Sequence, residues 1–359
     1  MKAIRIITAA FIALTFAAAC SGDGSRKSAD GSPAAKTSTT GGADLTGAGA
    51  TFPTPLYSKW FSDYAAKSGV KINYQSIGSG GGIRQLSEQT VDFGATDAPM
   101  SDAELAKAKG GAVMHIPTAL GAVVVTYNLA ELSAPLMLTG EVVAAIYQGQ
   151  ITRWNDARIA ALNPSLKLPA TDILVVHRSD GSGTSYVFTD YLASVSPAWA
   201  TKPGRGKEVQ WPTGLGAKGN EGVAGQVKQT PGAMGYIELA YANQNRLAAA
   251  HLKNANGEFV APTIASVTAA AAGAAAKLPA GTDYRVSIVN AAGAGVYPIS
   301  SFTWIIAYQK QRDAAKGKQL VEFLKWALTD GQGLEAALDY APLPEKMRGD
   351  LMGRLASIQ

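Results

Sequence analysis

The sequence predicts an α/β protein. Short runs rich in β-branched residues alternate along the chain with segments whose apolar residues recur every three or four positions, as strands alternating with helices do. Glycine-rich junctions open three of the expected helices, at 47–53, 77–82 and 178–185. Hydrophobic residues make up 47% of the 359, so the chain is long and apolar enough for two lobes with their own cores.

The N-terminus predicts export. Lys2 and Arg5 precede an apolar run from Ile6 to Ala19, and about fourteen residues are too few for a helix that spans a bilayer. We therefore expect residues 1–19 to be a signal peptide.

Cys20 is the sole cysteine of the chain, which excludes an internal disulfide. Its position directly after the apolar run predicts a lipid-modified N-terminus that anchors a bacterial lipoprotein to a membrane. Ala17 stands where a lipidation signal usually has leucine, so ordinary cleavage after Ala19 stays open. Residues 20–44 are mainly Ser, Gly, Ala and Thr, and they predict a flexible tether.

The first junction, Gly47-Ala-Gly-Ala-Thr-Phe-Pro53, opens a predicted helix. Thr51 is its expected N-cap, with Pro53 in the first turn. Four side chains then follow at spacings of three and four, as on the buried face of a helix: Leu56, Tyr57, Trp60 and Phe61.

The second junction, Ile77-Gly-Ser-Gly-Gly-Gly82, follows a strand-like run at 70–75 and precedes a predicted helix with Ile83 and Leu86. Ser79 is the expected N-cap, and the glycines let the backbone approach a ligand. Further strands are predicted at 122–127 and 173–176, and further helices at 103–109, 141–147, 268–277 and 318–328. The alanine-rich helix at 268–277 is expected at the surface.

The third junction, Arg178-Ser-Asp-Gly-Ser-Gly-Thr-Ser185, sets a fixed cation beside a glycine-rich turn. Arg178 offers a planar fork of donors to a tetrahedral anion, and Ser182, Gly183 and Thr184 add hydroxyl and backbone donors at a positive helix end. One such junction is also consistent with ordinary turn and N-cap chemistry. Three such junctions together with an arginine predict that several helix N-termini converge on one anion.

Asp97 lies between the second and third junctions, and a carboxylate repels an anion that it faces. Asp97 is either a turn or cap residue before Pro99, or it accepts a hydrogen bond from an anion that keeps a proton. Phosphate keeps a proton near neutral pH and sulfate does not. Because two desolvated acceptors that face each other repel strongly, the second interpretation predicts selection of phosphate over sulfate.

These residues resemble the phosphate-binding protein of the bacterial phosphate ABC transporter. The resemblance rests on Thr46–Pro53, Val91–Pro99 and Arg178–Ser185 and extends over nearly all of the chain after the signal peptide. Further stretches that carry it are Ile146–Trp154, Leu162–Pro164, Trp211–Asn220, Pro231–Tyr236 and Leu338–Ala341.

The resemblance implies a set of phosphate ligands: Thr51, Phe52, Ser79, Asp97, Arg178, Ser182, Gly183 and Thr184. In this set Asp97 accepts the phosphate proton and Arg178 is the cationic ligand. Asp180 is implied as the residue that holds the Arg178 guanidinium in place, which also offsets a buried cation.

The resemblance also implies a two-lobed periplasmic-binding-protein fold of type II, with the ligand in the cleft between the lobes. Two crossing hinge segments are expected near 120–127 and 297–306. Lobe 1 is then formed by 45–119 and 298–359, and lobe 2 by 120–297. Closure of the cleft is expected to be a hinge motion.

Charge and motifs disfavour several classes of function. The formal charge of +5 becomes about +3 without Lys2 and Arg5, and the basic residues are scattered, so nucleic-acid binding is not expected. His115, His177 and His251 lack Cys or His neighbours at metal-ligand spacing. No P-loop or Gly-x-Ser-x-Gly motif is present. We expect no metal, cofactor or catalytic residue.

The predicted function is capture of inorganic phosphate outside the cytoplasmic membrane and delivery to the membrane subunits of an ABC permease with its ATPase. The receptor is expected to be a monomer and no enzyme. Three alternatives stay open: a secreted phosphatase with Ser182 as nucleophile and Asp97 or Asp180 as acid or base, a receptor for another oxyanion such as sulfate or molybdate, and a surface adhesin.

Overall fold

A computed structural model describes residues 43–129, 132–275 and 283–359. The predictions for the signal peptide, Cys20 and nearly all of the tether lie outside the described residues. Residues Gly41–Gln359 form one compact unit. Across the described ranges, no helix is both long enough and apolar enough to cross a membrane.

One mixed sheet runs through the molecule in the order β2-β1-β3-β12-β4-β8-β6-β7. The strands are β1 (Leu45–Gly49), β2 (Ile72–Ser76), β3 (Phe93–Thr96), β4 (Val113–Tyr127), β6 (Leu174–Arg178), β7 (Leu215–Ala217), β8 (Ala233–Glu238) and β12 (Ser300–Tyr308). The short β9 (Ala248–Ala249) also pairs with β4. A second, small sheet joins β5 (Met137–Leu138), β10 (His251–Lys253) and β11 (Phe259–Val260).

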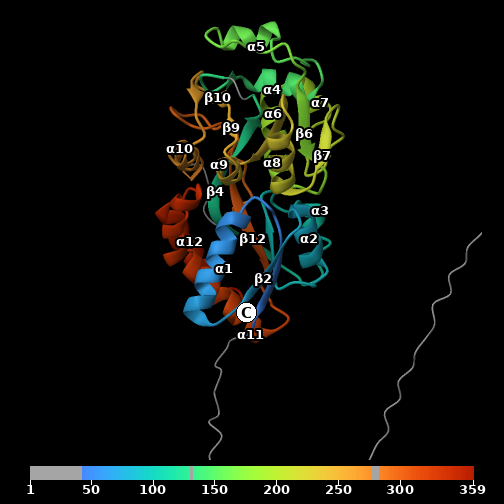
Figure 1. Cartoon of the computed structure of the whole chain (residues 1–359). Helices are drawn as coiled ribbons and strands as arrows, with labels where there is room; N and C mark the ends of the chain where they lie inside the picture. The colour runs from blue at the N-terminus through green and yellow to red at the C-terminus, as the bar shows by residue number, and fades with distance from the viewer. Residues whose placement is uncertain (1–42, 130–131, 276–282) are drawn as a thin grey trace, which may run out of the picture. The chain divides into compact units, whose positions relative to one another are not determined.

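The long strand β4 connects two halves of this sheet. Its residues 113–122 pair antiparallel with β12, and its residues 123–127 pair antiparallel with β8. We call β2-β1-β3-β12 half-sheet 1 and β8-β6-β7 half-sheet 2. Figure 1 shows β4 and β12 in the middle of the molecule, half-sheet 1 below and half-sheet 2 above. The crossing segments expected near 120–127 and 297–306 therefore fall on β4 and on the start of β12.

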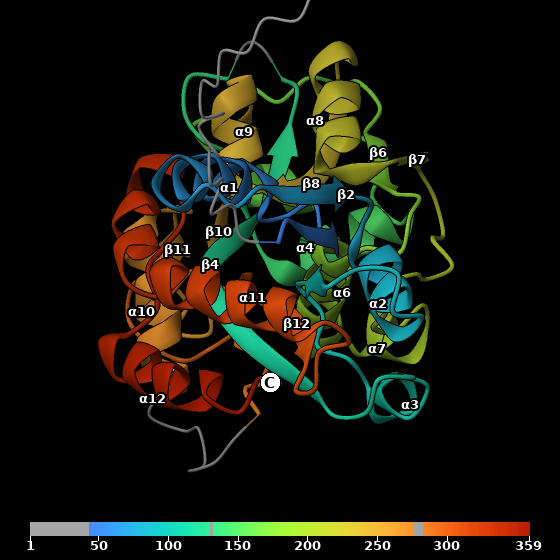
Figure 2. The ribbon, with the colours of Figure 1, turned by 90° about the horizontal axis from the view of Figure 1, so that it is seen from below.

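Helices flank both half-sheets. Around half-sheet 1 lie α1 (Thr54–Ser68), α2 (Ser79–Ser87), α11 (Ala314–Ala327) and α12 (Glu345–Leu355), and Figure 2 shows α11 lying across this half as seen from below. Around half-sheet 2 lie α4 (Gly140–Tyr147), α6 (Gly183–Val195), α8 (Gly219–Gln229) and α9 (Leu239–Asn245). The remaining helices are α3 (Asp102–Leu105), α5 (Ala157–Leu162), α7 (Pro197–Thr201), α10 (Ile264–Ala275) and the 3₁₀ turns Asp330–Leu334 and Ala336–Leu338.

The predicted apolar stripe of α1 is confirmed. Tyr57, Trp60 and Phe61 are buried, and they stack on one another and on α11 through Phe323 and Trp326. Aromatic pairs of this kind add to the free energy of burial. Because Phe61 also packs on Phe93 of β3, these aromatic contacts hold α1 between α11 and half-sheet 1.

Two predicted helices differ from the observed ones. The helix expected at 103–109 is the single turn α3, because a capping box of Ser101 and Glu104 starts it and the next N–H groups bond three residues back rather than four. The helix expected at 268–277 begins earlier, at Ile264, and it packs on β4 and β12 with Val267 and Ala270 buried. The part of that prediction beyond 275 lies outside the described residues.

Candidate functional site

Four helices begin at the carboxyl ends of parallel strands and point their N-termini at one place. They are α1 after β1, α2 after β2, α6 after β6 and α8 after β7. In open α/β sheets this edge is where ligands bind, and the first N–H groups of a helix have no partner within the helix. The sequence predicted three of these helix ends and missed the fourth as a site element.

Thr51 lies in this place but is not the N-cap of α1, so that prediction is wrong. The N-cap is Pro53, and no side chain caps the helix. The Thr51 hydroxyl instead accepts hydrogen bonds from the backbone N–H of Asn220 (3.2 Å) and from its Nδ2 (2.7 Å). Its carbonyl accepts from the Tyr241 hydroxyl (2.6 Å). The Thr51 hydroxyl is therefore engaged by a residue of α8 instead of capping its own helix.

Phe52 is fully buried beside Thr51. Its carbonyl accepts a hydrogen bond from the Tyr340 hydroxyl at 2.6 Å. Its ring packs so closely on Gly121 of β4 that a Cβ there would lie 2.6 Å from the ring. The contact fixes the turn before α1 against the crossing strand.

Ser79 is the first residue of α2 rather than its N-cap, which corrects the second capping prediction. The N-cap is Gly78, with φ of 85°, a conformation that favours glycine. A Cβ on Gly78 would lie 2.4 Å from Oδ2 of Asp180, across the boundary between the half-sheets. The Ser79 hydroxyl accepts from the backbone N–H of Asp97 (3.2 Å).

Asp97 follows β3 and is 1% exposed. Its Oδ1 accepts a hydrogen bond from the Thr303 hydroxyl (2.8 Å), whereas its Oδ2 is buried with no partner among the described residues. Burial raises the pKa of Asp97 to about 7, although the Thr303 hydrogen bond and the charge of Arg178 both lower it. The cap interpretation is wrong for the side chain, because Ser101 is the N-cap of the helix that follows.

Arg178 ends β6 and is 3% exposed. Its Nε donates to Oδ1 of Asp180 (2.7 Å), its Nη2 donates to Oδ2, and its Nη1 donates to the Thr184 hydroxyl (3.3 Å). Burial by itself would raise the pKa of Asp180, but the hydrogen bonds and charge of Arg178 outweigh it and hold that pKa below its ordinary value. The predicted contact between Arg178 and Asp180 is thus present in the structure.

The N-terminus of α6 meets Asp97. Ser182 is its N-cap and accepts from the backbone N–H of Ser185 (2.9 Å). Gly183 is so close to half-sheet 1 that a Cβ on it would lie 2.4 Å from the Ser79 hydroxyl and 2.5 Å from Oδ2 of Asp97. The unpartnered carboxylate oxygen therefore faces the positive end of α6.

Asn220, in the first turn of α8, is one of two site residues that were not predicted from the sequence. It is fully buried and joins Thr51 to Thr184, whose hydroxyl accepts from its Nδ2 at 3.0 Å. The signal was available, since Gly214-Leu-Gly-Ala-Lys-Gly-Asn220 is another glycine-rich junction that opens a helix. Thr303 was also missed, because nothing in its own strand distinguishes it.

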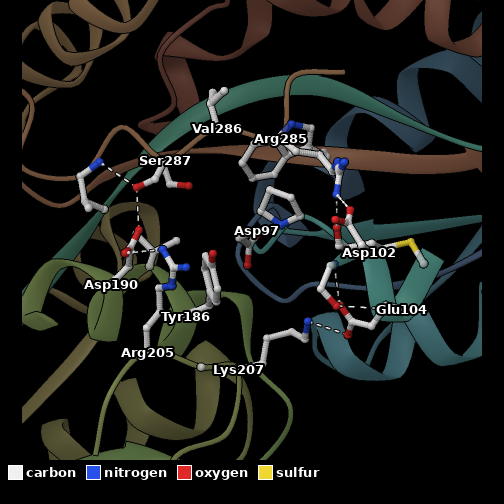
Figure 3. A pocket seen from close by; sticks show the side chains of 18 residues that line it. Asp97, Asp102, Glu104, Tyr186, Asp190, Arg205, Lys207, Arg285, Val286 and Ser287 are labelled. Carbon is white, nitrogen blue, oxygen red and sulfur yellow. Dashed lines mark hydrogen bonds and ion pairs between the residues drawn. The ribbon is translucent and has the colours of Figure 1, made fainter. Parts of the chain in front are cut away.

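A cavity of about 700 Å³ reaches this place from outside. Among the eight predicted ligands, all within the described residues, Asp97 alone lines it. Figure 3 shows Asp97 surrounded by three ion pairs. They join Lys207 to Glu104 (2.7 Å), Arg285 to Asp102 (2.7 Å) and Arg205 to Asp190 (3.0 Å). These three cations have partners, whereas Oδ2 of Asp97 is buried without one among the residues that the structure describes.

The arrangement offers several hydrogen-bond donors and one acceptor to a ligand. It offers no activated nucleophile among the described residues. The Ser182 hydroxyl accepts from the Ser185 N–H, and among the described residues no imidazole or carboxylate hydrogen-bonds it as a general base would. In the ranges that the structure describes, no group of three or more His, Cys, Asp or Glu side chains is placed to hold a metal ion.

Comparisons with known proteins agree with this fold. A family described as the PBP superfamily domain matches residues 34–330. The phosphate-binding protein PstS of Xylella fastidiosa strain Temecula1 is 47% identical over 304 residues, which are 84% of this chain and 82% of that protein. The phosphate-binding protein PstS of Pasteurella multocida is 44% identical over 310 residues, 86% of this chain and 89% of its own.

The solved structures show the same fold. The phosphate-binding protein from Stenotrophomonas maltophilia superimposes with a TM-score of 0.68 at 23% identity, over 87% of this chain and 93% of its own. A high-affinity periplasmic phosphate-binding protein called PfluDING, solved with phosphate bound, gives a TM-score of 0.68 at 23% identity, over 86% of this chain and 93% of its own. The chain therefore has the two-lobed α/β fold of the periplasmic binding proteins and belongs to the PstS family within the PBP superfamily.

Proposed function

We propose that this protein is a receptor for inorganic phosphate that serves an ABC permease and is not an enzyme. The observation that carries the proposal is Oδ2 of Asp97, a buried acceptor with no described partner that faces the N-terminus of α6. An anion with one proton satisfies both this acceptor and the donors around it. The names and identities of the PstS relatives support phosphate as that anion.

The phosphate ligands we propose are the eight residues expected from the sequence: Thr51, Phe52, Ser79, Asp97, Arg178, Ser182, Gly183 and Thr184. The donors come from hydroxyl groups, from first-turn N–H groups of helices and from the guanidinium of Arg178. Asp180 keeps this guanidinium in place through two hydrogen bonds. Neutral donors that are already oriented bind an anion without a large reorganisation of the protein.

Selectivity follows from the single acceptor. An ionised Asp97 accepts a hydrogen bond from the P–OH group that phosphate keeps near neutral pH, whereas fully ionised sulfate presents only acceptors to it. The raised pKa of Asp97, about 7, means that a small drop in pH protonates the carboxyl and turns it into a donor. Discrimination against sulfate should therefore weaken below neutral pH.

Delivery requires opening and closing of the cleft. We assign lobe 1 to 45–119 and 298–359 and lobe 2 to 120–297, with β4 and the start of β12 as the hinge. Contacts that close the cleft, such as Gly80 N–H to the Gly181 carbonyl (2.8 Å), join backbone to backbone across this boundary. Hinge bending at strand segments is a common mode of closure.

The same proposal includes export and attachment. We propose that residues 1–19 direct export, that a lipid on Cys20 anchors the protein to a membrane, and that the receptor works as a monomer. Its partners are then phosphate, the transmembrane permease subunits and their ATPase.

Calorimetric titration of the chain from Ser21 onward, stripped of bound anion, tests the proposal. Phosphate at neutral pH should bind one to one and tightly, and sulfate should give no response. Sulfate binding of equal strength would make the protein a general oxyanion receptor. Binding of neither anion would contradict the proposal, and turnover of p-nitrophenyl phosphate lost in Ser182→Ala would point to a phosphatase.

A further inference from the structure

We propose that Asn220 is a positioning residue that makes the hydroxyl groups of Thr51 and Thr184 obligate donors to the bound anion. This inference rests on the proposed phosphate function. It concerns which polar groups of the site donate a hydrogen bond to the anion and which accept one. It assigns a role to a residue outside the set of eight ligands.

The backbone N–H of Asn220 and both polar atoms of its side chain form hydrogen bonds. Its backbone N–H and Nδ2 donate to the Thr51 hydroxyl at 3.2 and 2.7 Å, and Nδ2 also donates to the Thr184 hydroxyl at 3.0 Å. Its Oδ1 accepts from the backbone N–H of Glu238 at 2.9 Å. The side chain is fully buried, so no water competes for these bonds.

The orientation of the Asn220 amide follows from its partners. The backbone N–H of Glu238 is only a donor, so the amide atom that faces it must be the oxygen. The NH₂ group then has to face the two threonine hydroxyls. A flipped amide would put two donors together at Glu238 and is excluded on that ground.

A threonine hydroxyl has one proton to donate and two lone pairs to accept with. At Thr51 the backbone N–H and Nδ2 of Asn220 occupy both lone pairs. At Thr184 the Nη1 of Arg178 (3.3 Å) and Nδ2 of Asn220 occupy both. Each hydroxyl proton is thereby left to point away from these donors, into the site.

The consequence is that each of these polar groups is fixed either as a hydrogen-bond donor or as an acceptor toward the anion. A free hydroxyl rotates and presents either its proton or a lone pair, and a lone pair repels an anion oxygen. With Asn220 in place both threonines present protons, and Oδ2 of Asp97 remains the acceptor for a ligand proton. Thr51 follows β1 and Thr184 lies in α6, so the same amide also sets this pattern across the two half-sheets.

A double-mutant cycle on phosphate affinity tests the role. Thr51→Val and Asn220→Ala should each weaken phosphate binding by about 10- to 100-fold, as loss of a supporting hydrogen bond around a site does. The double variant should bind phosphate within about 3-fold of Asn220→Ala alone, because without Asn220 the Thr51 hydroxyl is misoriented and its removal costs little further affinity. Thr51→Ser, which keeps the hydroxyl, should lose less phosphate affinity than Thr51→Val and should remain sensitive to Asn220→Ala.

Controls separate positioning from general damage. Asn163→Ala removes another buried amide, which bonds to Met137 and Ile159 far along the chain from the site, and phosphate affinity should not change. Thermal unfolding reports whether each variant is folded. If Asn220→Ala does not fold, the near-isosteric Asn220→Asp replaces it in the cycle, and its carboxylate should draw both hydroxyl protons away from the ligand.

The outcomes are distinct. Strong non-additivity between positions 51 and 220 supports the role of Asn220. Additive losses in variants that remain folded show that Asn220 only stabilises the fold, and they overturn this inference while the phosphate function stands. Absence of phosphate binding by the wild-type protein overturns both.

Discussion

At the scale of single residues, the chemistry depends on what surrounds each polar atom. Asp97 has one oxygen paired with Thr303 and one with no described partner, and its burial is nearly complete. A buried acceptor without a partner costs free energy, which a ligand proton can recover. Three predictions belong to this scale.

The Asp97→Asn variant should bind sulfate. The amide keeps the shape of the carboxyl but supplies N–H donors, so an anion without a proton no longer faces an acceptor. We expect the ratio of phosphate to sulfate affinity to fall by at least about 100-fold, since an unpaired charged contact costs several kcal/mol. Paired calorimetric titrations measure the ratio, and an unchanged ratio would remove Asp97 as the selectivity device.

Sulfate binding by the wild-type protein should strengthen as the pH falls through about 7. Protonation of Asp97 converts its free oxygen to a donor, and the pKa of about 7 places this change near neutrality. Titrations with sulfate between pH 5 and 8 check this: the affinity should rise by up to about tenfold per pH unit as the pH falls toward 7, and level off below it. Asp97→Asn, which has no proton to gain there, is the control and should show a flat profile.

Stability of the ligand-free protein should fall as the pH rises between about 4 and 7. Unfolded Asp97 loses its proton near 3.9, whereas the folded group keeps it to about 7, so the folded state binds more protons in this window. The stabilisation is complete below the lower pKa and lost above the upper one, and it amounts to at most about 4 kcal/mol. Urea unfolding of wild type and Asp97→Asn measures it as a difference, and parallel pH profiles would contradict it.

At the scale of elements, the site is a meeting of strand ends and helix starts. α1, α2, α6 and α8 each follow a parallel strand, so their N-termini share one edge of the sheet. The glycines at these junctions let the two half-sheets approach. Gly183 shows this most clearly, because α6 begins in contact with Asp97 and Ser79.

Gly183→Ala should weaken phosphate binding by about 100-fold or more while the protein stays folded. The added methyl group would lie 2.4 Å from the Ser79 hydroxyl and 2.7 Å from the backbone nitrogen of Asp97, and that backbone cannot move cheaply. Opening of the proposed cleft relieves the clash. The substitution should therefore destabilise the closed form and leave the protein folded. Gly225→Ala in α8, where a Cβ meets nothing within 4 Å, is the matched control. Equal affinities of the two variants would argue against a tight approach of α6.

At the scale of the whole molecule, β4 connects the two half-sheets, and hydrogen bonds cross the boundary between them. Lys207 and Glu104, which both line the cavity, form an ion pair at 2.7 Å, and both side chains are about three-quarters or more buried. Glu104 is also held by Ser101, which lowers its freedom to move. We therefore expect the pair to favour the closed form of the proposed cleft.

Lys207→Met should speed phosphate release about 2- to 5-fold, the range expected for a partly exposed ion pair. Stopped-flow displacement of bound phosphate measures the release rate, and the difference from wild type should shrink at high salt because ions screen the pair. Lys59→Met breaks the ion pair with Asp63 within α1 and should leave release unchanged. If the effect of Lys207→Met on the release rate did not depend on salt, the Lys207–Glu104 ion pair would be excluded as its cause.

The sequence by itself determined the α/β class, the buried stripe of α1, the glycine-rich helix starts and the polar residues that gather at them. These depend on local spacing and residue type, which a single chain displays directly. Family resemblance extended this to the two-lobed fold. The ligand roles of the eight residues stay predictions until affinities are measured.

The tertiary structure alone decided which hydroxyl bonds to which amide. Thr51 and Ser79 were expected to cap their own helices, but their oxygens accept from Asn220 and Asp97, residues that lie 169 and 18 positions away in sequence. The raised pKa of Asp97 likewise arises from burial by β12 and α6 rather than from its neighbours in the chain. Local pattern cannot show such pairs, because hydrogen bonds and desolvation depend on distance in space, and the fold sets that distance.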